Sequence, residues 1–416
     1  MLPVAEASAR ILAGIGPLGV ERVALRDALG RVLAEPVASP LTIPAHDNSA
    51  MDGYAVRADD VIGASAASPV VLTVLETVAA GSLPTRSVAP GTATRIMTGA
   101  PIPDGADSVV RVEDTDAGET VVTVTTDRDA RSNIRPRGED VERGATVLEA
   151  GAPIGPAQIG VLASVGAASV PVYRRPRVAF IATGDELVEL DRFDEVLAGE
   201  RIVTSNSYAL DAMIRAAGGI PLDLGIARDD PAELRARIEG AAGSDVLITS
   251  AGISAGAYDY VRPVLAELGV KLEVWKVRMR PGAPLGFGRL GAMPWIGLPG
   301  NPVSTMVTFE LFVRPMLRRM LGHTRLFRVP IRVTLAEPVR IGAPRTHFLR
   351  AVLSTGEGGE RVARLTGPQG SGILTSMSRA NALLVVPHDR SEVAAGETLN
   401  AIPLGEDAEL SARFEL

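Results

Sequence analysis

Apolar and polar residues alternate in several ways along this chain, and each way predicts a different kind of unit. Between Arg177 and Pro302, short apolar runs typical of buried strands alternate with stretches whose apolar residues recur at helical spacing. The runs Val178–Thr183 and Asp245–Thr249 are examples of such strands. Strands that alternate with helices favour parallel pairing with right-handed crossovers, so an α/β sandwich is predicted, with ligands at the carboxyl ends of its strands.

The remaining elements of this region follow from the same two patterns. Further strands are expected at Ile220–Ala227, Lys271–Val277, Leu285–Phe287 and Trp295–Leu298. Helices are expected at Ser205–Ala217, Pro231–Ala242, Asp259–Gly269 and Pro302–Leu321.

Period-two alternation, the pattern of half-buried strands, occurs on both sides of this region. Before it, the strands are expected at Val70–Val78, Thr92–Ile96, Ser108–Val112 and Thr120–Thr125. After it, they are expected at Val329–Leu335, Phe348–Leu353, Arg361–Leu365, Ala382–Val386 and Thr398–Ile402. Glycine and proline turns separate the strands in both places.

These patterns predict a multidomain protein of α/β and β units. It has a central α/β three-layer sandwich at 176–326, an inserted β-rich domain at 54–140 and a small β-barrel-like domain at 327–416. Residues 1–53 and 141–175 together form a helical and extended linker domain, with helices at 3–14 and Pro156–Val165.

Composition excludes several classes of function. The absence of cysteine removes disulfides and thiolate metal sites, and the four histidines are too far apart in sequence to form a metal-binding pair. A net charge of −7 and 4% aromatic residues argue against a nucleic-acid partner. The chain starts with no signal-peptide pattern, and prolines interrupt its charge-free stretch 151–173, so a cytoplasmic protein without a membrane partner is expected.

The stretch Thr249–Gly256 carries the densest signal for a binding site. It places hydroxyls and glycines between a predicted strand and the predicted helix that starts at Asp259. Backbone N–H groups in such a loop, together with a helix N-terminus, bind phosphate and other oxyanions. An anion-binding loop is therefore predicted at this strand end.

Acidic and basic residues follow the neighbouring strands. Because carboxyl ends of parallel strands share one edge, these residues are expected to approach the loop. Each could have an ordinary role as a helix cap or surface charge, but together they suit a phosphorylated ligand with Mg²⁺. The candidates for Mg²⁺ are Asp185, Glu186, Asp229 and Asp259, and the cations are Lys276 and Arg280.

Several familiar reaction classes have no motif here. The chain has neither the dinucleotide-binding glycine fingerprint nor a Walker A sequence, and no histidine lies near the candidate site for a Ser-His-Asp arrangement. The residues by themselves therefore indicate Mg²⁺-assisted chemistry on a phosphorylated small molecule and go no further.

Six motifs in fixed order along nearly the whole chain resemble the molybdopterin molybdenumtransferase family, which includes the E domain of gephyrin. The ordered set is far more specific than any one member. The motifs are Asp47-Asn-Ser-Ala-Met-Asp-Gly-Tyr-Ala55, Met97-Thr-Gly-Ala-Pro-Ile-Pro103, Asn133-Ile-Arg-Pro-Arg-Gly-Glu-Asp140, Thr183-Gly-Asp-Glu-Leu187, Gly297-Leu-Pro-Gly-Asn-Pro-Val-Ser304 and Gly370-Ser-Gly372.

The resemblance implies a transferase that completes molybdenum cofactor biosynthesis. It implies an elongated homodimer of four-domain subunits that depends on Mg²⁺, with 176–326 as the molybdopterin-binding domain. The implied reaction takes adenylylated molybdopterin and molybdate, releases AMP and leaves molybdenum on the dithiolene. The adenylyltransferase of the same pathway is a possible further partner.

The resemblance also implies roles for particular residues. Catalytic roles are expected for Asp52, Thr98, Glu186, Asp259, Lys276 and Arg280, with Asp52 and Thr98 supplied by the partner subunit. Substrate contacts are expected from Thr183, Gly184, Asp185, Ser205, Asn206, Asp229, Thr249, Ser250, Gly252, Ser254, Gly256, Pro299, Asn301 and Ser371.

Three departures from the family pattern fall near the predicted site. The glycine-rich loop begins at Ala251 where the family usually has glycine, and Ala257 stands where an acid is usual. Downstream, Ala283 replaces a lysine, and Arg262 stands where lysine is common. Two alternatives stay open: a non-catalytic molybdopterin-binding scaffold, and another Mg²⁺-dependent phosphoanhydride hydrolase.

Overall fold

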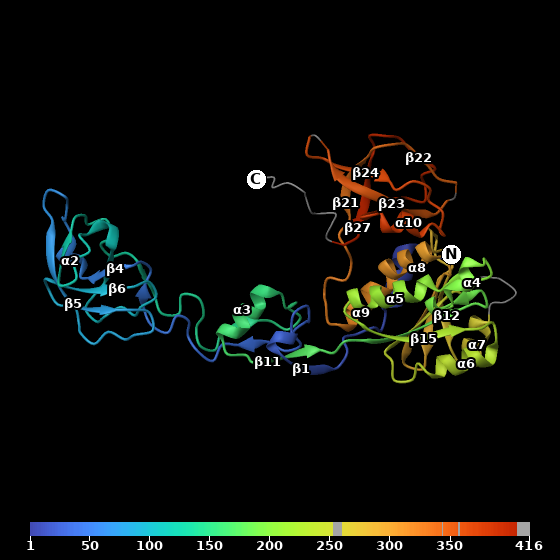
Figure 1. Ribbon diagram of the computed structural model, residues 1–416, viewed down its shortest axis with the longest axis horizontal. Helices are drawn as coiled ribbons and strands as arrows, with labels where there is room; N and C mark the ends of the chain where they lie inside the picture. The colour runs from blue at the N-terminus through green and yellow to red at the C-terminus, as the bar shows by residue number, and fades with distance from the viewer. Residues whose placement is uncertain (253–259, 343, 357, 406–416) are drawn as a thin grey trace.

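A computed structural model of the chain describes residues 1–252, 260–342, 344–356 and 358–405. The described residues form four parts: the β-rich unit, the linker unit and the α/β unit follow one another along the long axis, and the C-terminal part lies beside the α/β unit (Figure 1). No helix in this described part is both long and apolar enough to cross a membrane.

The α/β unit is built on a six-stranded sheet of order β15-β12-β16-β20-β19-β17. Its four parallel strands are β12 (Arg177–Thr183), β15 (Ile220–Ala227), β16 (Val246–Ser250) and β20 (Met293–Leu298). The connecting helices are α5 (Ser205–Ala216), α6 (Pro231–Glu239) and α7 (Val261–Glu267). The predicted alternation of strands and helices is confirmed.

One strand of this sheet runs antiparallel to its neighbours, in a place where no helix was expected between strands. β19 (Gly286–Leu290) pairs antiparallel with both β20 and the edge strand β17 (Lys271–Trp275). Only two residues separate β19 from β20, a length that allows a hairpin but not the helical crossover that parallel pairing needs.

The predicted long helix at Pro302–Leu321 has an interruption. It consists of α8 (Pro302–Thr308), a π-helical turn (Phe309–Val313) and α9 (Arg314–Met320). Proline lacks an N–H and its ring crowds the carbonyl one turn earlier, so Pro315 cannot continue regular α-helical bonding. The wider turn immediately before it accommodates that defect.

Helices cover both faces of the α/β sheet (Figure 1). On one face α5, α8 and α9 share a core with the N-terminal helix α1 (Val4–Leu12), which packs around Phe180 and Ile248. On the other face α6 and α7 pack against Ile181, Leu247 and Trp295. This is the three-layer arrangement expected from the pattern of apolar residues.

The C-terminal part is a small closed barrel that lies beside α8 (Figure 1). Its strands are β21 (Ile331–Leu335), β23 (Thr346–Thr355), β24 (Arg361–Leu365), β25 (Ala382–Val386) and β27 (Thr398–Pro403). Pairing of β23 with β25 closes the ring, as the barrel-like prediction requires. β18 (Met279–Arg280), which belongs to the α/β part of the sequence, pairs in parallel with β23. The short helix α10 (Leu374–Ser378) follows β24 and precedes β25 in the sequence.

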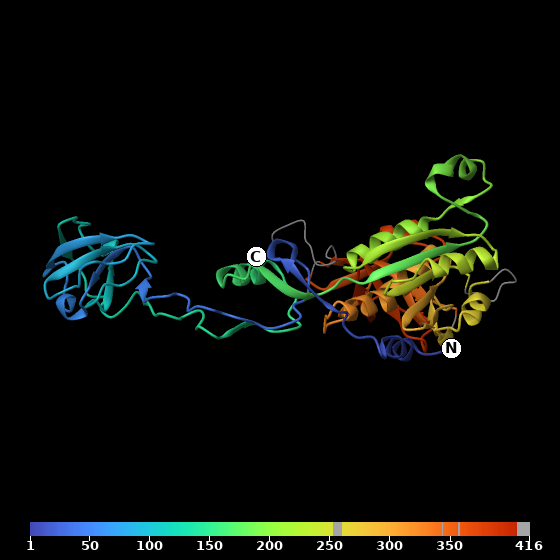
Figure 2. The same ribbon diagram turned by 90° about the horizontal axis from the view of Figure 1, so that it is seen from below.

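A linker unit joins segments that are far apart in sequence. β1 (Val20–Ala24) pairs with β11 (Ser169–Tyr173), β2 (Val37–Ala38) pairs with β10 (Thr146–Leu148), and α3 (Pro156–Ser164) packs against them. Two extended segments then run from this unit to the far end of the molecule, close together along their length (Figure 2).

The far end is the β-rich unit. Its sheet has the order β7-β4-β6-β5-β8, with α2 (Ala58–Val61) beside it. The strands are β4 (Gly53–Val56), β5 (Val70–Val78), β6 (Thr92–Ile96), β7 (Ser108–Arg111) and β8 (Val121–Val124), with the small pair β3 (Asn48–Ser49) and β9 (Ile134–Arg135) at its entrance.

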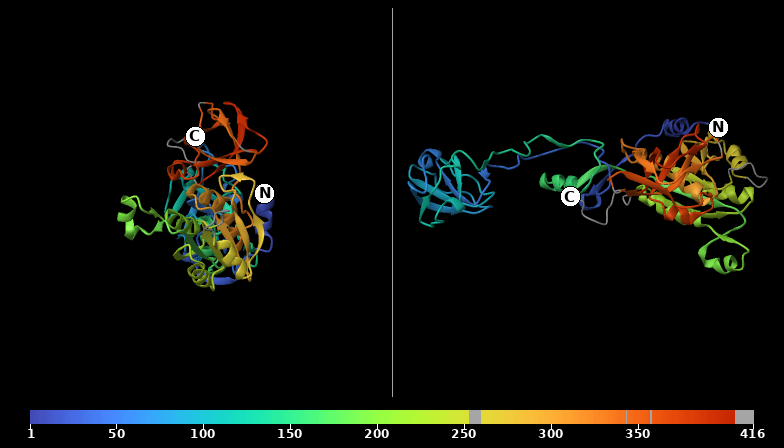
Figure 3. Two further views of the ribbon diagram at one scale, coloured as in Figure 1. Left: turned by 90° about the vertical axis from the view of Figure 1, so that its right-hand side faces the viewer. Right: turned by 90° about the horizontal axis from the view of Figure 1, so that it is seen from above.

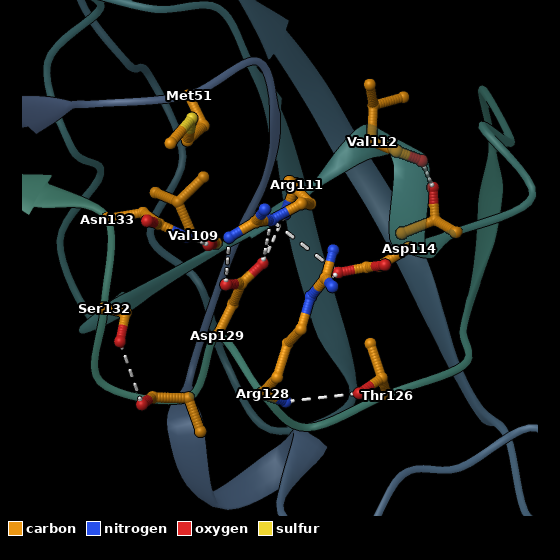
Figure 4. Close-up of polar contacts among 12 residues, drawn as sticks. Met51, Val109, Arg111, Val112, Asp114, Thr126, Arg128, Asp129, Ser132 and Asn133 are labelled. Atoms are coloured by element: carbon orange, nitrogen blue, oxygen red, sulfur yellow. Dashed lines mark hydrogen bonds and ion pairs between the residues drawn. The ribbon is translucent and has the colours of Figure 1, made fainter.

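Side chains satisfy the free edge of β7 in the β-rich unit (Figure 4). The Asp129 carboxylate accepts hydrogen bonds from the Arg111 backbone N–H at 3.2 Å and from its guanidinium at 3.0 Å on each oxygen. The Asn133 amide donates to the Val109 carbonyl at 2.9 Å. Unpaired edge groups invite association with other strands, and this cluster removes them.

A projection from the α/β unit had no counterpart in the sequence-based prediction. The small strands β13 (Leu187–Val188) and β14 (Ile202–Val203) pair in parallel, and helix α4 (Phe193–Leu197) lies between them. Figures 2 and 3 show it standing clear of the layers of the unit. Two-residue strands carry too little alternation to be detected from a pattern.

Candidate functional site

Five polar segments meet at one edge of the α/β sheet. β12, β15, β16 and β20 end at this edge because they are parallel to one another. β17 also ends there: it is antiparallel to β19, which is antiparallel to β20, so β17 and β20 run in the same direction. The expectation that these strand ends share an edge is confirmed. The segments that follow the strands are 184–186, 228–230, 251–252, 276 and 299–301.

A cavity of about 620 Å³ opens at this edge above β12, β16 and β20. It is bounded on one side by β13 and β14 of the projection and on another by Gly372 near the barrel. Eight residues singled out in the sequence line it: Thr183, Glu186, Ser205, Asn206, Ser250, Gly252, Pro299 and Asn301.

We call this space the edge cavity. The start of α5 forms one of its walls. The Asn206 amide donates to Ser250 Oγ at 2.9 Å and to the Gly300 carbonyl at 2.8 Å. These bonds tie the helix start to the loops after β16 and β20. Free N–H groups at a helix N-terminus favour anions, so this wall suits phosphate.

The loop after β16 needs glycine at one position. Gly252 has φ +70°, and a Cβ there would lie 2.2 Å from Val261 Cγ2. Thr183 Oγ1 donates to the Ser250 carbonyl at 3.4 Å, which holds the base of the loop. The predicted contacts Ser254, Gly256 and Asp259 lie outside the described residues, as does Ala257.

Three carboxylates gather at the β12–β15 end of the edge. The Asp229 N–H donates to Asp185 Oδ1 at 3.2 Å. Burial, followed by repulsion from Asp185 and Glu186, raises the pKa of Asp229. Arg228 and Arg201 donate to the Asp185 backbone carbonyl, so they do not neutralise these carboxylates by direct pairing.

The acids are close together without forming a preformed metal cage. Among the described residues, no three acidic or histidine side chains are arranged to hold a metal ion. Mg²⁺ commonly uses only one or two protein carboxylates and completes its shell with phosphate oxygens and water. The acidic end therefore suits a cation that arrives with a phosphorylated ligand.

A second cavity, of about 490 Å³, lies where the α/β unit meets the barrel. Arg280 of β18 and the fully buried Arg350 of β23 both line it. Arg350 donates from Nε to Ser376 Oγ and from one terminal nitrogen to the Gly370 carbonyl, both at 2.9 Å, while its other terminal nitrogen has no partner. Burial lowers the pKa of Arg350.

Arg350 was missed by the sequence reasoning. Its hydrogen-bond partners among the described residues are a hydroxyl and backbone carbonyls and include no carboxylate, and a buried cation without a countercharge is costly unless an anion joins it. The signal was present in the sequence, because an arginine interrupts the apolar strand Phe348–Leu353. We call this second space the basic cavity.

The edge cavity and the basic cavity share two stretches of chain. In the stretch 280–284, Pro284 lines the edge cavity and Arg280 lines the basic cavity. In the stretch 370–372, Gly372 lines the edge cavity and Gly370 lines the basic cavity. The Val303 N–H of α8 donates to the Ser371 carbonyl at 3.1 Å, which fixes the second stretch. The two cavities are therefore linked through these two stretches of chain.

Some predicted site residues lie away from the edge cavity. The Thr249 hydroxyl accepts a hydrogen bond from Trp295 Nε1 at 3.2 Å inside the core. Lys276 follows β17, four inter-strand steps from β12, which corresponds to ~19 Å at normal strand spacing. Acids and Lys276 therefore occupy opposite ends of the edge.

Asp52 and Thr98 are together, but in the β-rich unit. Asp52 Oδ1 accepts hydrogen bonds from the Thr98 N–H and hydroxyl, both at 2.7 Å. The backbone bond and then the hydroxyl bond lower the pKa of Asp52. The β-rich unit stands far from the α/β unit of its own chain, as Figure 1 and the right panel of Figure 3 show.

Family profiles cover most of the chain. "MoeA N-terminal region (domain I and II)" matches residues 2–166, "Probable molybdopterin binding domain" matches 179–319 and "MoeA C-terminal region (domain IV)" matches 332–404. These matches agree with the resemblance seen in the six motifs.

Similar proteins cover nearly the full length. Molybdopterin molybdenumtransferase 2 of Mycobacterium tuberculosis is 41% identical, over 91% of this chain and 93% of its own. Molybdopterin molybdenumtransferase of Nostoc is 38% identical, over 92% and 88%. The crystal structure of the molybdopterin biosynthesis moeA protein from Pyrococcus horikoshii has a TM-score of 0.83 at 31% identity, over 97% and 100%.

Proposed function

This chain belongs to the MoeA family of molybdopterin molybdenumtransferases, and we propose on that premise that it inserts molybdenum from molybdate into adenylylated molybdopterin with release of AMP. The observation that carries the proposal is the pair of cavities, one at the α/β edge and one between the α/β unit and the barrel, whose linings share the stretches 280–284 and 370–372. One is lined by hydroxyls, the Asn206 amide and the Glu186 carboxylate, and the other by the buried Arg350 guanidinium, which has no countercharge among the described residues.

The edge cavity suits the pterin and its phosphate. Its volume of about 620 Å³ lies in the range of small-molecule pockets. The N-terminal turn of α5 and the loop after β16 offer N–H groups and the hydroxyls of Ser205 and Ser250 to phosphate oxygens. Asn206 keeps the wall rigid through its bonds to Ser250 and Gly300.

The basic cavity suits molybdate. A tetrahedral dianion would give Arg350 the countercharge that this guanidinium lacks within its described surroundings. Arg280 from β18 adds a second cation on the same side. Because the cavities share the stretches 280–284 and 370–372, bound molybdate lies next to the ligand whose sulfurs must receive the metal.

Mg²⁺ fits the acidic end of the edge. Asp185, Glu186 and Asp229 would hold it together with phosphate oxygens, and the repulsion that raises the pKa of Asp229 would be relieved by the cation. When bound, Mg²⁺ supplies positive charge that stabilises the developing charge on the phosphoanhydride oxygens.

The proposed reaction breaks one phosphoanhydride bond and forms two metal–sulfur bonds. Water supplies the oxygen that attaches to phosphorus, and AMP leaves. One molybdate oxygen leaves as water with the two thiol protons, and both sulfurs bind molybdenum. The chain's own part is to hold both reactants and to place cations beside oxygens that gain charge.

The experiment is molybdate-dependent AMP release by the purified full chain with adenylylated molybdopterin and Mg²⁺. Arg350→Met and Arg280→Met should each lower the rate about 100-fold or more, by analogy with loss of one oxyanion contact. The matched control is Arg332→Met, because Arg332 is exposed on the same barrel. Thermal unfolding of each variant separates lost chemistry from lost folding.

Two other outcomes would contradict the proposal. Tight binding of the pterin without AMP release would favour a scaffold. Release of AMP from unrelated adenylates, without dependence on molybdate, would favour a general Mg²⁺-dependent hydrolase.

A further inference from the structure

The turn that follows β12 carries two of the three carboxylates at the acidic end of the edge. We call residues 184–187 the acidic turn, because it contains Asp185 and Glu186. Gly184 has φ +142°, and a Cβ there would lie 2.3 Å from Glu186 Oε2, so the Glu186 carboxylate folds back over the backbone of the turn. The shape of this turn therefore decides where both carboxylates lie.

The segment after β15 holds the acidic turn through a backbone group and a side chain. The Asp229 N–H donates to Asp185 Oδ1 at 3.2 Å. One terminal nitrogen of Arg228 donates to the Asp185 carbonyl at 3.0 Å and to the Leu187 carbonyl at 3.2 Å. Arg228 thus ties the turn to the segment that supplies the third carboxylate, Asp229.

A second guanidinium reaches the same carbonyl from the projection. Arg201, just before β14, also donates to the Asp185 carbonyl, and its Nε lies 3.9 Å from Glu195 of α4. Two guanidiniums on one oxygen repel each other, so this arrangement needs negative charge close by. The three carboxylates at this end of the edge supply that charge.

The Arg228 guanidinium balances these carboxylates without binding them. Both of its hydrogen bonds within the described residues go to carbonyl oxygens, so the carboxylates of the turn are left for other partners. Groups that hold metal ligands from behind set the orientation of those ligands, and their loss commonly costs about 10–100-fold in metal affinity. The contacts of Arg228 are of this kind.

We propose that Arg228 is a positioning residue, whose guanidinium fixes the acidic turn against Asp229 and so sets the carboxylates for the Mg²⁺ that accompanies the substrate. The proposal rests on the proposed function for the presence of that cation. In this role Arg228 acts through the turn and touches neither the cation nor the substrate. It lowers the cost of ordering the turn when the cation binds.

The first test measures metal binding without turnover. Mn²⁺ is added to the purified full chain, and the free ion is followed by electron paramagnetic resonance. Arg228→Met should weaken the Mn²⁺ affinity about tenfold, because the carboxylates lose their fixed arrangement. Removal of a positive charge by itself would strengthen cation binding, so the sign of the change separates positioning from charge. An equal or tighter affinity in Arg228→Met, or no Mn²⁺ binding by the wild-type chain, would overturn the proposal.

Two further variants show whether the loss comes from the bonds of this guanidinium. Arg228→Lys keeps the charge and a donor on a shorter side chain, and it should recover part of the Mn²⁺ affinity. Arg235→Met is the matched control, because Arg235 of α6 pairs with Glu267 of α7 and its loss should leave the affinity unchanged. Equal losses in Arg228→Met and Arg235→Met would contradict a role specific to the acidic turn.

Hydrogen exchange tests the turn itself, apart from the metal and the reaction. The Asp229 N–H donates to a carboxylate of the acidic turn, and the Ile202 N–H donates to the Glu186 carbonyl at 3.0 Å. Both amides should exchange faster in Arg228→Met, while amides of the barrel strand β23 keep the wild-type rate and show that the variant is folded. Unchanged exchange of both amides would overturn the proposal.

Kinetics connect the turn to the reaction. Arg228→Met should raise the Mg²⁺ concentration for half-maximal AMP release about tenfold and keep the rate at saturating Mg²⁺ within about threefold of wild type. An unchanged Mg²⁺ dependence would overturn the positioning role alone. Missing AMP release by the wild-type chain, together with Mn²⁺ binding that Arg228→Met weakens, would overturn only the proposed function.

Discussion

Ala251 has a backbone conformation that is costly for any residue except glycine. Its φ is +74°, and its N–H donates to the Leu298 carbonyl at 3.0 Å, which fixes the start of the loop at the edge cavity. The sequence had identified this position as a departure from the family's glycine. The structure supplies the physical consequence, which is local strain beside the site.

Ala251→Gly is expected to stabilise the protein. Relief of the left-handed strain is worth about 1–2 kcal/mol, and the greater freedom of glycine in the unfolded chain offsets about 0.4–1 kcal/mol of it. A net gain of roughly 0.5–1 kcal/mol should appear in urea unfolding followed by tryptophan fluorescence. Ala236→Gly, in the middle of α6, is the control and should lose about 1 kcal/mol. A loss at both positions would contradict the strain.

Ala283 is a residue where the sequence alone raised a functional question. It lies between Arg280 of the basic cavity and Pro284 of the edge cavity, where the family usually has lysine. Ala283→Lys should lower the molybdate concentration for half-maximal AMP release roughly three- to tenfold, because a further cation contributes about 1 kcal/mol. Ala232→Lys, on exposed α6, should change nothing. An unaltered molybdate dependence in Ala283→Lys would place this side chain away from the anion.

Asp229 allows Mg²⁺ binding to be tested without turnover. Burial and repulsion from Asp185 and Glu186 raise the pKa of Asp229, so its charge opposes folding, and Asp229→Asn should raise the Tm measured without Mg²⁺. Mg²⁺ at a hundred times its Kd should stabilise the wild-type chain by about 2.7 kcal/mol and the variant distinctly less.

The control for this experiment is Asp223→Asn on the same strand. Burial raises the pKa of Asp223 as well, but it lies before the edge, so its substitution should leave the Mg²⁺ effect intact. Equal stabilisation of Asp229→Asn and wild type by Mg²⁺ would refute the assignment of Asp229 to the cation.

At the scale of elements, local patterns predicted most of the helices and strands. Val178–Thr183 and Pro156–Val165 were found within one residue or two because burial and periodicity are properties of neighbouring residues. β18 was missed because its partner β23 begins 67 residues later than Met279, and two residues show no period of their own. The antiparallel direction of β19 was missed because a pattern of apolar residues carries no strand direction.

The edge of β7 depends on one buried carboxylate. Asp129 is removed from water, which opposes its ionisation, yet hydrogen bonds from Arg111 and Asn133 outweigh this and lower its pKa. A group whose pKa is lower in the folded state stabilises the protein above its unfolded pKa, near 4, and this contribution is lost as pH falls through the folded value.

Asp129→Asn should therefore destabilise the β-rich unit at pH 7 by about 2–3 kcal/mol, and the difference from wild type should shrink below pH 4. Hydrogen exchange of the Arg111 amide measures this locally, since that N–H donates to Asp129. Asp59→Asn removes an exposed pair with Arg131 at 3.6 Å and should cost less than about 0.5 kcal/mol. A difference that persists at low pH would contradict the role of the charge.

At the scale of the whole molecule, the distance between units decides how the site can be completed. Asp52 and Thr98 form a hydrogen-bonded pair in the β-rich unit. The two extended segments place this unit at the opposite end of the molecule from the α/β unit (Figure 1). If these residues serve catalysis, as the family resemblance implies, a second copy of the chain must supply them. The homodimer is our proposal for this reason.

Mixed dimers test it directly. Asp52→Asn and Arg350→Met should each be inactive, but their co-expression should restore about a quarter of wild-type activity. Half of the dimers then contain one of each chain, and one of their two sites receives no substitution. If Asp52 served the site of its own chain, every site in the mixed dimers would carry one substitution and activity would stay low. Each variant expressed alone is the control, because all of its dimers carry the same substitution in both chains.

The sequence alone determined the family, the classes of unit and the kinds of side chain at the strand ends, because motifs and periodicity depend on residues close together in the chain. Tertiary structure alone decided which of those side chains meet. It turned Thr249 inward to Trp295, separated the acids from Lys276 by four strand spacings, and brought the unsuspected Arg350 beside Arg280. Strand order and side-chain direction result from packing between distant segments, and no local pattern encodes them.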